Sequence, residues 1–576
     1  MLAVFVTSGT AQSQGDESQT TPATGAITGQ VVTETGQPLA GAIVSVRAYG
    51  ATGQERNTIT DGEGKFQVGG LDPLSYIVSA FVSAYVATPR DPDSTQAPYY
   101  GVGDSVRLQL MKGGVITGTV TTSAGEPVVG VRVQAFLIRD SNGQPPRYGM
   151  PYRGRTTDDR GIYRIYGLSP GTYVVSAGGA FSGFGASPYD TDTPTYAPSS
   201  ARDNALEVNI PVSGEAANID IRYRGEPGHM ISGNAIDAAG ASIPSGFSIS
   251  LSLTSNGLSQ MSNSSYQPPG SRGFSFYGIA DGDYDVVAQM YSPGGEFALS
   301  EPRRVKVRGA DITGVELTVK PLGSIAGHLE LEESKVLECK GKRRPLFGET
   351  LITPWHDEKA ATKDQPQFPW SFGSPAFPDK QGDFTLRNLA PGQYRFHTRP
   401  LAKYWYLQSI SLRPSVSPAA KGGPTTRAVD AARNWIAVRS GDRVSGLVIT
   451  LAEGAASLKG QIKVAEGQKL LPKVFVYLVP AEADKAEDVL RYFVSPVAVD
   501  GSFALNNLPP GRYLTIAKAS GENESNLLSK LRLPDDIETR VKLRREAGLA
   551  KTETELKPCQ NLTDYSLPFN TTVQPK

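Results

Sequence analysis

The chain has 576 residues, too many for a single hydrophobic core, so we expect several domains. Its 57 basic and 57 acidic residues cancel, and this balance excludes long-range attraction to nucleic acid or an anionic membrane. Glycine and proline are frequent, and tyrosine far outnumbers methionine. Such a composition is typical of many short strands, so we expect an all-β protein.

Residues 1–24 are expected to be a signal-peptide remnant and a disordered leader. Met1–Ala11 resembles the end of a secretory signal, because an apolar run precedes small residues. It lacks a basic start, so we expect the true N-terminus upstream; the alternative is an ordinary frayed end. Residues 12–24 are polar and should be disordered. We therefore expect a secreted, periplasmic or cell-surface protein with no transmembrane segment, since no stretch approaches the ~20 apolar residues of a membrane span.

Two sequence signals recur along the chain. The first is Gly-x-Pro-apolar-x-Gly, at residues 36–41 and 125–130, and an alternating apolar strand follows each copy. The second runs from a Gly-x-aromatic segment through Leu or Ile to a Pro-Gly-like turn and a Tyr. Its five copies span residues 61–76, 159–173, 273–284, 382–394 and 500–513. Each copy predicts two strands joined by a turn, with the aromatic residue, the Leu or Ile and the Tyr facing a sandwich core.

Closing strands that run into a new Gly-rich start divide the chain. We predict five β-sandwiches at residues 25–112, 113–227 with a long Tyr/Pro/Gly loop, 228–322, 323–453 with an insertion and an aromatic cluster, and 454–576 with a helix and a tail. For the fifth module, Glu553–Leu556 is the expected closing strand. Because the predicted linkers have only a few residues, we expect a semi-rigid rod.

These motifs resemble the carboxypeptidase regulatory-like domain of bacterial secreted proteins. The order GxITGxV, GxPlxGaxVxv and TDxxGxFxxxgLxPGxYxvxa carries the resemblance, closely in the first two modules and partly in the other three. It implies a tandem array of small Greek-key sandwiches, prealbumin-like or Ig-like, related to transthyretin-like and collagen-adhesin B-type modules. It implies little about function, because such folds occur in enzymes, adhesins and receptors alike.

The residues give no support for catalysis or metal binding. The histidines at 229, 328, 356 and 397 are dispersed, and none stands in a zinc-peptidase arrangement. The acidic run 281–285 resembles calcium ligands but occupies the repeat's turn position, so we interpret it as a turn. We expect no enzyme, no metal and no cofactor.

One helix is expected near the C-terminus. Pro534–Asp536 gives it an acidic start, and Gly548 can end it. Ile537 and Val541 share a face, which we expect to pack on the fifth module. The two cysteines, Cys339 and Cys559, predict a disulfide in an exported protein, with two separate thiols as the alternative.

The densest aromatic cluster lies in the fourth module and is our predicted binding face. It comprises Trp370, Phe372, Tyr404, Trp405 and Tyr406. The alternative for such rings is that they cap the ends of the sandwiches or seal module interfaces. We expect a non-catalytic secreted or envelope protein for structural spacing, binding a polysaccharide, a peptide or an envelope protein through its loops. The second possibility is an accessory subunit of an envelope enzyme or transporter. The sequence does not give the ligand or the oligomeric state.

Overall fold

The computed structural model describes most of the chain. The described residues are 25–48, 55–87, 99–141, 143–144, 152–179, 187–241, 243, 245–255, 258–291, 295–357, 373, 375–399, 402–413, 428–464, 471, 473–498, 500–520 and 524–569. The expected signal remnant and leader therefore lie outside the described residues.

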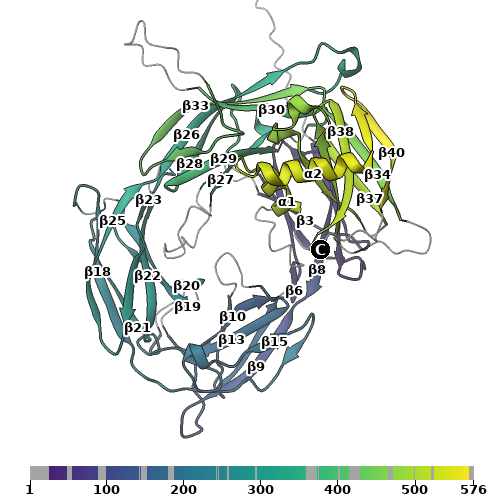
Figure 1. Ribbon diagram of the computed structural model, residues 1–576. Coiled ribbons are helices and arrows are strands. Elements are labelled where there is room, and N and C mark those ends of the chain that lie inside the picture. Colours follow the sequence, from purple (N-terminus) through teal and green to yellow (C-terminus); the bar gives the residue numbers. More distant parts are fainter. Residues whose placement is uncertain are drawn as a thin grey trace, which may run out of the picture.

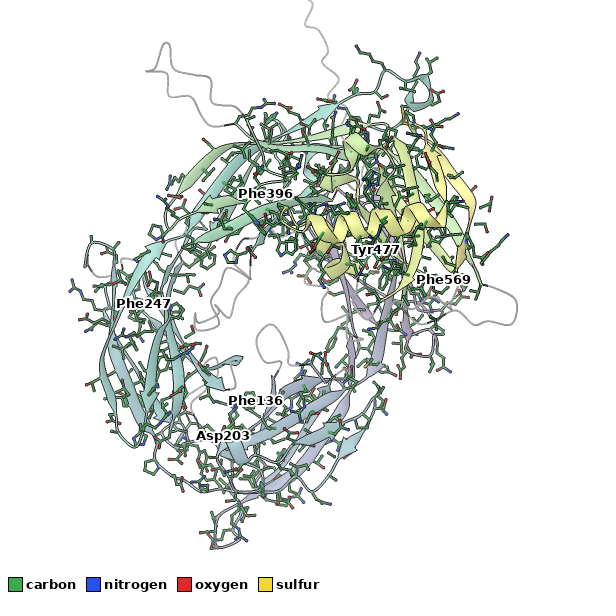
Figure 2. All side chains as sticks on the ribbon, in the orientation of Figure 1. Phe136, Asp203, Phe247, Phe396, Tyr477 and Phe569 are labelled. Atoms are coloured by element: carbon green, nitrogen blue, oxygen red, sulfur yellow. A yellow bond between two sulfur atoms is a disulfide. The ribbon has the colours of Figure 1, made fainter. Side chains whose placement is uncertain are left out.

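The fold is all-β, as the sequence predicted, and it contains a separate hydrophobic core for each expected module. These cores are built from residues within 27–110, 116–223, 231–319, 325–451 and 456–569. We number the modules 1 to 5 with the ranges given above. Phe247 and Phe396, labelled in Figure 2, belong to the cores of modules 3 and 4.

Modules 1 and 2 are each built from two facing groups of strands. Module 1 contains β1 (Gly25–Thr33), β2 (Ile43–Ala48), β3 (Glu55–Ile59), β4 (Lys65–Leu71), β5 (Tyr76–Phe81), β6 (Tyr85–Ala87), β7 (Tyr99–Tyr100) and β8 (Ser105–Lys112), in sheets β4-β1-β8-β6 and β3-β2-β5-β7. Module 2 contains β9 (Gly114–Thr121), β10 (Arg132–Asp140), β11 (Tyr152–Thr156), β12 (Ile162–Leu168), β13 (Gly171–Ala177), β14 (Thr195–Tyr196), β15 (Val208–Ile210), β16 (Glu215–Ala216) and β17 (Ile221–Arg222).

Module 3 differs because β23 pairs with both β22 and β25, which joins its strands into one curled sheet. Its strands are β18 (His229–Asp237), β19 (Phe247–Ser255), β20 (Leu258–Gln267), β21 (Gly273–Ile279), β22 (Gly282–Tyr291), β23 (Phe297–Ser300), β24 (Arg303–Val307) and β25 (Ile312–Pro321). Module 4 contains β26 (Gly323–Glu332), β27 (Leu351–His356), β28 (Asp383–Leu389), β29 (Gly392–Arg399), β30 (Trp405–Leu412), β31 (Val429–Asp430), β32 (Ile436–Val438) and β33 (Arg443–Glu453). Module 5 contains β34 (Ala456–Val464), β35 (Val474–Pro480), β36 (Phe493–Pro496), β37 (Ser502–Leu508), β38 (Gly511–Ala519), β39 (Glu553–Leu556) and β40 (Asn561–Phe569).

In every module the opening strand pairs in parallel with strands from the end of the module. The pairs are β1 with β8, β9 with β16 and β17, β18 with β25, β26 with β33, and β34 with β40. Module 5 corrects one prediction, since Glu553–Leu556 forms β39, which pairs with β38 in the other sheet. The closing strand is β40, and its polar alternation hid it from the sequence pattern.

The Tyr of the second motif makes the same hydrogen bond in all five copies. Its hydroxyl donates a hydrogen bond to the carbonyl four residues earlier, as in Tyr76 to Asp72 (2.8 Å) and Tyr513 to Pro509 (2.8 Å). The other three bonds come from Tyr173, Tyr284 and Tyr394. Each hydroxyl thereby finds a partner while the ring fills the core.

The residue before the motif's Leu or Ile is a β-bulge residue with positive φ in every module. These residues are Gly70 (66°), Gly167 (73°), Gly278 (69°), Asn388 (60°) and Asn507 (56°). Gly and Asn are the residues that adopt this left-handed conformation most readily. We call this position the bulge residue.

The modules follow one another around a ring, so the expected rod is wrong (Figure 1). Only Gly113 separates β8 from β9, and only Leu322 separates β25 from β26. Connections this short were the reason to expect a rod. They fix the modules to one another but leave each joint angled, and successive angles of the same sense turn the array back on itself.

Two helices follow β38, where one was expected. Helix α1 (Glu524–Leu531) precedes α2 (Ile537–Ala550), which Asp536 caps through its bond from Thr539 N. The predicted packing face of α2 is wrong, because Ile537 and Val541 are exposed while Leu543 and Ala547 are buried against Phe475, Tyr477 and their neighbours. In the described part of the chain, neither helix is long and apolar enough to span a membrane.

Candidate binding surface at the junction of modules 4 and 5

In modules 3, 4 and 5 the bulge residue contacts the preceding module at one recurring place. That place is the turn that directly follows the strand containing the motif's Tyr. We call it the acceptor turn. A Cβ on Gly278 would lie 2.6 Å from Asp190 O of module 2, so this joint requires glycine. Asn388 uses its amide instead, accepting from Phe297 N (2.8 Å) and donating to Gly295 O (3.1 Å) in module 3. At the first joint, β6 of module 1 lies beside β12, which carries Gly167.

The joint between modules 4 and 5 has the most extensive set of contacts. Asn507 Nδ2 donates to both Ala402 O (2.9 Å) and Trp405 O (2.8 Å). Tyr404, at φ 68°, accepts the amide protons of Gly454 and Ala455 at its carbonyl. The backbone of residues 402–405 is therefore satisfied by module 5, and the two modules are held in a fixed relation.

Of the predicted aromatic residues, Tyr404, Trp405 and Tyr406 lie at this joint rather than on an open face. Trp405 is only 1% exposed and belongs to the core of module 4. Tyr404 and Tyr406 are half-buried. The hydroxyl of Tyr404 accepts from Asn561 Nδ2 (3.0 Å), and this bond, with the nearby Lys342 and Lys403, lowers the pKa of Tyr404. Trp370 and Phe372 lie outside the described residues.

A cation–aromatic stack on the outer face of sheet β27-β29-β32 was missed by sequence reasoning. The Arg395 guanidinium lies between the rings of Trp355 (4.3 Å) and Trp435 (4.6 Å). Trp355 and Arg395 are direct neighbours in the β27–β29 ladder, and Trp435 immediately precedes β32. The three residues are far apart in sequence, so local clustering gave no signal. A desolvated guanidinium between two rings stabilises this face.

The connection between α1 and α2 covers the stack. Arg395 Nη1 donates to Arg532 O, and Trp435 Nε1 donates to Asp535 Oδ2 (3.2 Å). Arg540 in turn donates to the carbonyls of Leu531, Leu533 and Pro534, which fixes the connection. The helices therefore attach module 5 to module 4 as well as covering their own sheet.

Burial shifts the pKa of the basic side chains here. It lowers the pKa of Arg395 to about 10 and that of Arg532 to about 10, so both remain charged at neutral pH. Desolvation, with the positive Arg532 and Arg395 nearby, lowers the pKa of His397 to about 3. His397 is thus neutral and packs on Trp355, with ring centroids 5.3 Å apart.

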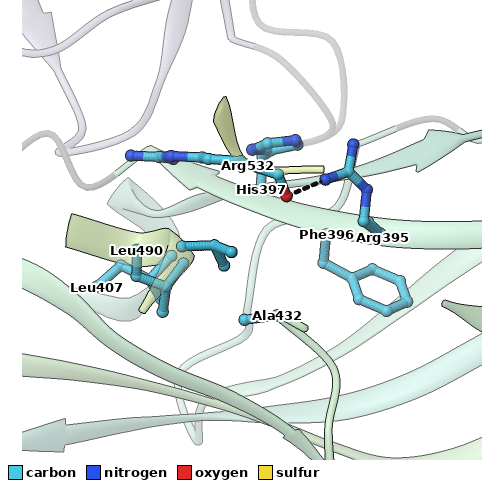
Figure 3. Close-up of a pocket in the computed structure, with 8 residues that line it drawn as sticks. Arg395, Phe396, His397, Leu407, Ala432, Leu490 and Arg532 are labelled. Carbon is cyan, nitrogen blue, oxygen red and sulfur yellow. Dashed lines mark hydrogen bonds between the residues drawn. The ribbon is translucent and has the colours of Figure 1, made fainter. Parts of the chain in front are cut away.

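A small pocket with a cavity volume of about 10 Å³ lies between the two modules (Figure 3). Its lining is largely apolar, from Phe396, Leu407, Val489 and Leu490, with Arg395, His397 and Arg532 at one side. Cavities that enclose small-molecule ligands are commonly ~300–1,000 Å³. This pocket is therefore a packing gap at the joint.

The cysteines reinforce the same junction. Cys339 Sγ and Cys559 Sγ are bonded (2.03 Å), forming the disulfide expected from the sequence. Cys339 lies in a short 3₁₀ turn after β26, and Cys559 lies between β39 and β40. The bridge therefore joins module 4 to module 5.

The histidines and acidic residues have structural partners. Within the described ranges, no group of three His, Cys, Asp or Glu side chains is arranged to hold a metal. The turn interpretation of the acidic run in module 3 is wrong for two of its residues, because Asp283 and Asp285 lie in β22, where Asp283 pairs with Arg308 and Asp285 with Arg304. His328 lies 2.7 Å from Asp383 across the β26–β28 pair.

The sheets and the joints between them define a tandem array of β-sandwich modules. The family model of the carboxypeptidase regulatory-like domain matches residues 26–93 and 115–203. Modules 1 and 2 therefore each contain a segment that matches the carboxypeptidase regulatory-like domain. No curated protein matches the chain.

Among solved structures, similar chains include two pilins and a protein of Bacillus anthracis. The Bacillus anthracis TIE protein is 14% identical, with 52% of this chain and 51% of that chain covered and a TM-score of 0.14. The minor pilin GBS52 of Streptococcus agalactiae is 14% identical, over 35% of this chain and 96% of its own, with a TM-score of 0.19. The major pilin subunit BcpA of Bacillus cereus is 12% identical, over 51% and 99%, with a TM-score of 0.14. The chain thus spans about half the length of the TIE protein.

Proposed function

We propose that this protein is an exported, non-catalytic scaffold that holds the loops of five β-sandwich modules in fixed positions for binding a polysaccharide, a peptide or another envelope protein. The recurring joint carries the proposal. The bulge residue and the acceptor turn meet at successive junctions, and the amide of Asn388 or Asn507 makes two hydrogen bonds there. Joints built from backbone contacts suit a spacer better than a flexible tether.

The rim of the junction between modules 4 and 5 is the proposed contact surface. Tyr404, Tyr406, Trp355 and Trp435 are each half-buried, so their rings offer an edge to a ligand while the joint holds them in place. Aromatic rings fixed in this way bind sugars and peptides with little loss of conformational entropy. The proposal extends to Trp370 and Phe372, which belong to the same module.

A binding screen on the purified full chain tests this function. The probes are immobilised glycans, cell-wall polysaccharide and peptides, alongside hydrolysis assays on the same substrates. We expect binding without turnover, and weaker binding for Trp355→Ala or Tyr404→Ala. The matched control is Tyr277→Ala, since Tyr277 is 54% exposed on module 3, away from the junction. Turnover of a probe, or equal binding by all three variants, would contradict the proposal.

A second candidate function is an accessory subunit of an envelope enzyme or transporter. It is favoured by an apolar stripe on module 1, where Ile59, Ile43 and Phe81 lie side by side across β3, β2 and β5 and are 66%, 47% and 62% exposed. Neighbouring exposed apolar side chains of this kind mark protein contacts. Co-purification of one envelope protein that is lost with Ile59→Lys, but kept with Tyr266→Lys on module 3, would favour this candidate.

A further inference from the structure

A segment of module 4 crosses from its own module to its neighbours. Residues 333–350, between β26 and β27, form what we call the strap. Ser334 N donates to Glu453 Oε2 (3.0 Å), and Lys342 Nζ lies 4.7 Å from the ring centroid of Tyr404. The disulfide from Cys339 ties the strap to module 5. The strap is therefore anchored on both sides of the junction.

The far end of the strap contacts module 1. There the buried carboxylate of Glu349 pairs with Arg343 (2.8 Å) and accepts from Leu346 N (3.1 Å), which shapes a tight turn around Gly348. A Cβ on Gly348 would lie only 3.4 Å from Leu74 Cδ2. Leu74 belongs to the turn between β4 and β5 of module 1, so modules 1 and 4 approach each other at this point.

Leu74 also departs from the repeat. Two residues before the motif's Tyr, the other four modules carry Gly171, Gly282, Gly392 and Gly511, whereas module 1 carries Leu74. The other modules therefore show that the turn forms without a side chain here. Leu74 is half-buried against the core of module 1, and the part of its side chain that the module leaves uncovered gains apolar contact if another segment covers it. The one module with a Leu is the one whose turn meets the strap.

We propose that Leu74 and the strap form a ring-closing interface, in which the turn of module 1 docks on Gly348 and the Cys339–Cys559 disulfide holds the strap in position to receive it. The partner of this turn of module 1 is thus module 4 of the same chain. Because Gly348 has no side chain, the strap backbone can approach module 1 closely, and Leu74 supplies the apolar contact. The disulfide fixes the strap to module 5, so its position does not depend on module 4 alone.

Small-angle X-ray scattering of the full chain tests the interface. The wild type is expected to scatter as a ring. Leu74→Gly, which restores the residue of the other modules, and Gly348→Arg, which inserts a bulky side chain, should both raise the radius of gyration and the maximum dimension. Replacing both cysteines by serine should produce a similar but smaller rise. Phe81→Ser, which removes another large exposed side chain of module 1, should leave the scattering unchanged.

Two outcomes would overturn the proposal. One is a wild type that already scatters as an extended chain. The other is unchanged scattering for both Leu74→Gly and Gly348→Arg, with circular dichroism showing native strand content. Because the two substitutions lie in different modules, misfolding of one module leaves the other variant as a valid test.

Discussion

Asn507 of module 5 donates from one Nδ2 atom to the backbone oxygens of both Ala402 and Trp405 in module 4. The same residue adopts φ 56° at a β-bulge of its own sheet. One side chain therefore satisfies a local backbone requirement and a contact between modules. Asn388 combines the same two roles at the preceding joint.

Replacing this asparagine should separate the two roles. Asn507→Ala loses two hydrogen bonds and places a Cβ residue in the left-handed region, so we expect a loss of about 2–3 kcal/mol. Asn507→Gly keeps the backbone conformation and should lose about 1–2 kcal/mol. Urea unfolding followed by tryptophan fluorescence measures both, since Trp405 lies at the joint. Equal stability of the alanine and glycine variants would argue against the backbone role.

The tyrosine hydroxyls make a second prediction. Tyr513 is fully buried, and its hydroxyl donates to Pro509 O, so Tyr513→Phe leaves that carbonyl without its partner. We expect module 5 to lose about 1 kcal/mol. Thermal unfolding monitored by circular dichroism checks this value. Tyr277→Phe on the surface of module 3 serves as the control and should change nothing.

Removing the disulfide should destabilise the junction strongly. Cys339 and Cys559 are 220 residues apart in sequence. Closing so long a loop lowers the conformational entropy of the unfolded chain, which raises the free energy of unfolding by about 5 kcal/mol. We expect the Cys339→Ser/Cys559→Ser variant to unfold at lower urea concentration in modules 4 and 5, with module 2 unaffected. Hydrogen exchange read module by module distinguishes this result from a uniform loss.

His397 predicts a loss of stability in acid. Its pKa is about 3 in the folded protein and about 6.5 in an unfolded chain, so the unfolded state binds the proton first as the pH falls. The contribution of neutral His397 to the free energy of unfolding is fully present above pH ~6.5. It declines below that pH by up to about 1.4 kcal/mol per pH unit. His397→Phe keeps an aromatic ring beside Trp355 and removes the titration. The wild type should therefore lose more stability than this variant between pH 7 and pH 4.5, and identical pH profiles would contradict the assignment.

The sequence predicted what depends on local chemistry. Gly, Pro and Tyr at fixed spacing define a turn between two strands, so the sandwich fold and its repeat could be derived from them. Glu553–Leu556 was misassigned because a short alternating strand looks the same in either sheet of a sandwich. The face of α2 was mistaken because Arg540, a charged residue, is buried there by the carbonyls it binds.

The features that remained hidden depend on contacts between distant segments. The stack of Trp355, Arg395 and Trp435 forms only once β27, β29 and β32 are aligned. The ring depends on the angles at four joints, and a linker's length does not encode an angle. Leu74 was visible as a departure from the repeat, but its meaning required the position of Gly348.

The parallel pairing of first and last strands has a mechanical consequence. Tension along the chain enters a module at the start of its opening strand and leaves at the end of its closing strand. When those strands are parallel neighbours, as β26 and β33 are, the load acts along the ladder and strains its hydrogen bonds together rather than one at a time. Forced unfolding is governed by the unfolding rate, and this geometry slows it. Each module is thus built to resist pulling from its ends.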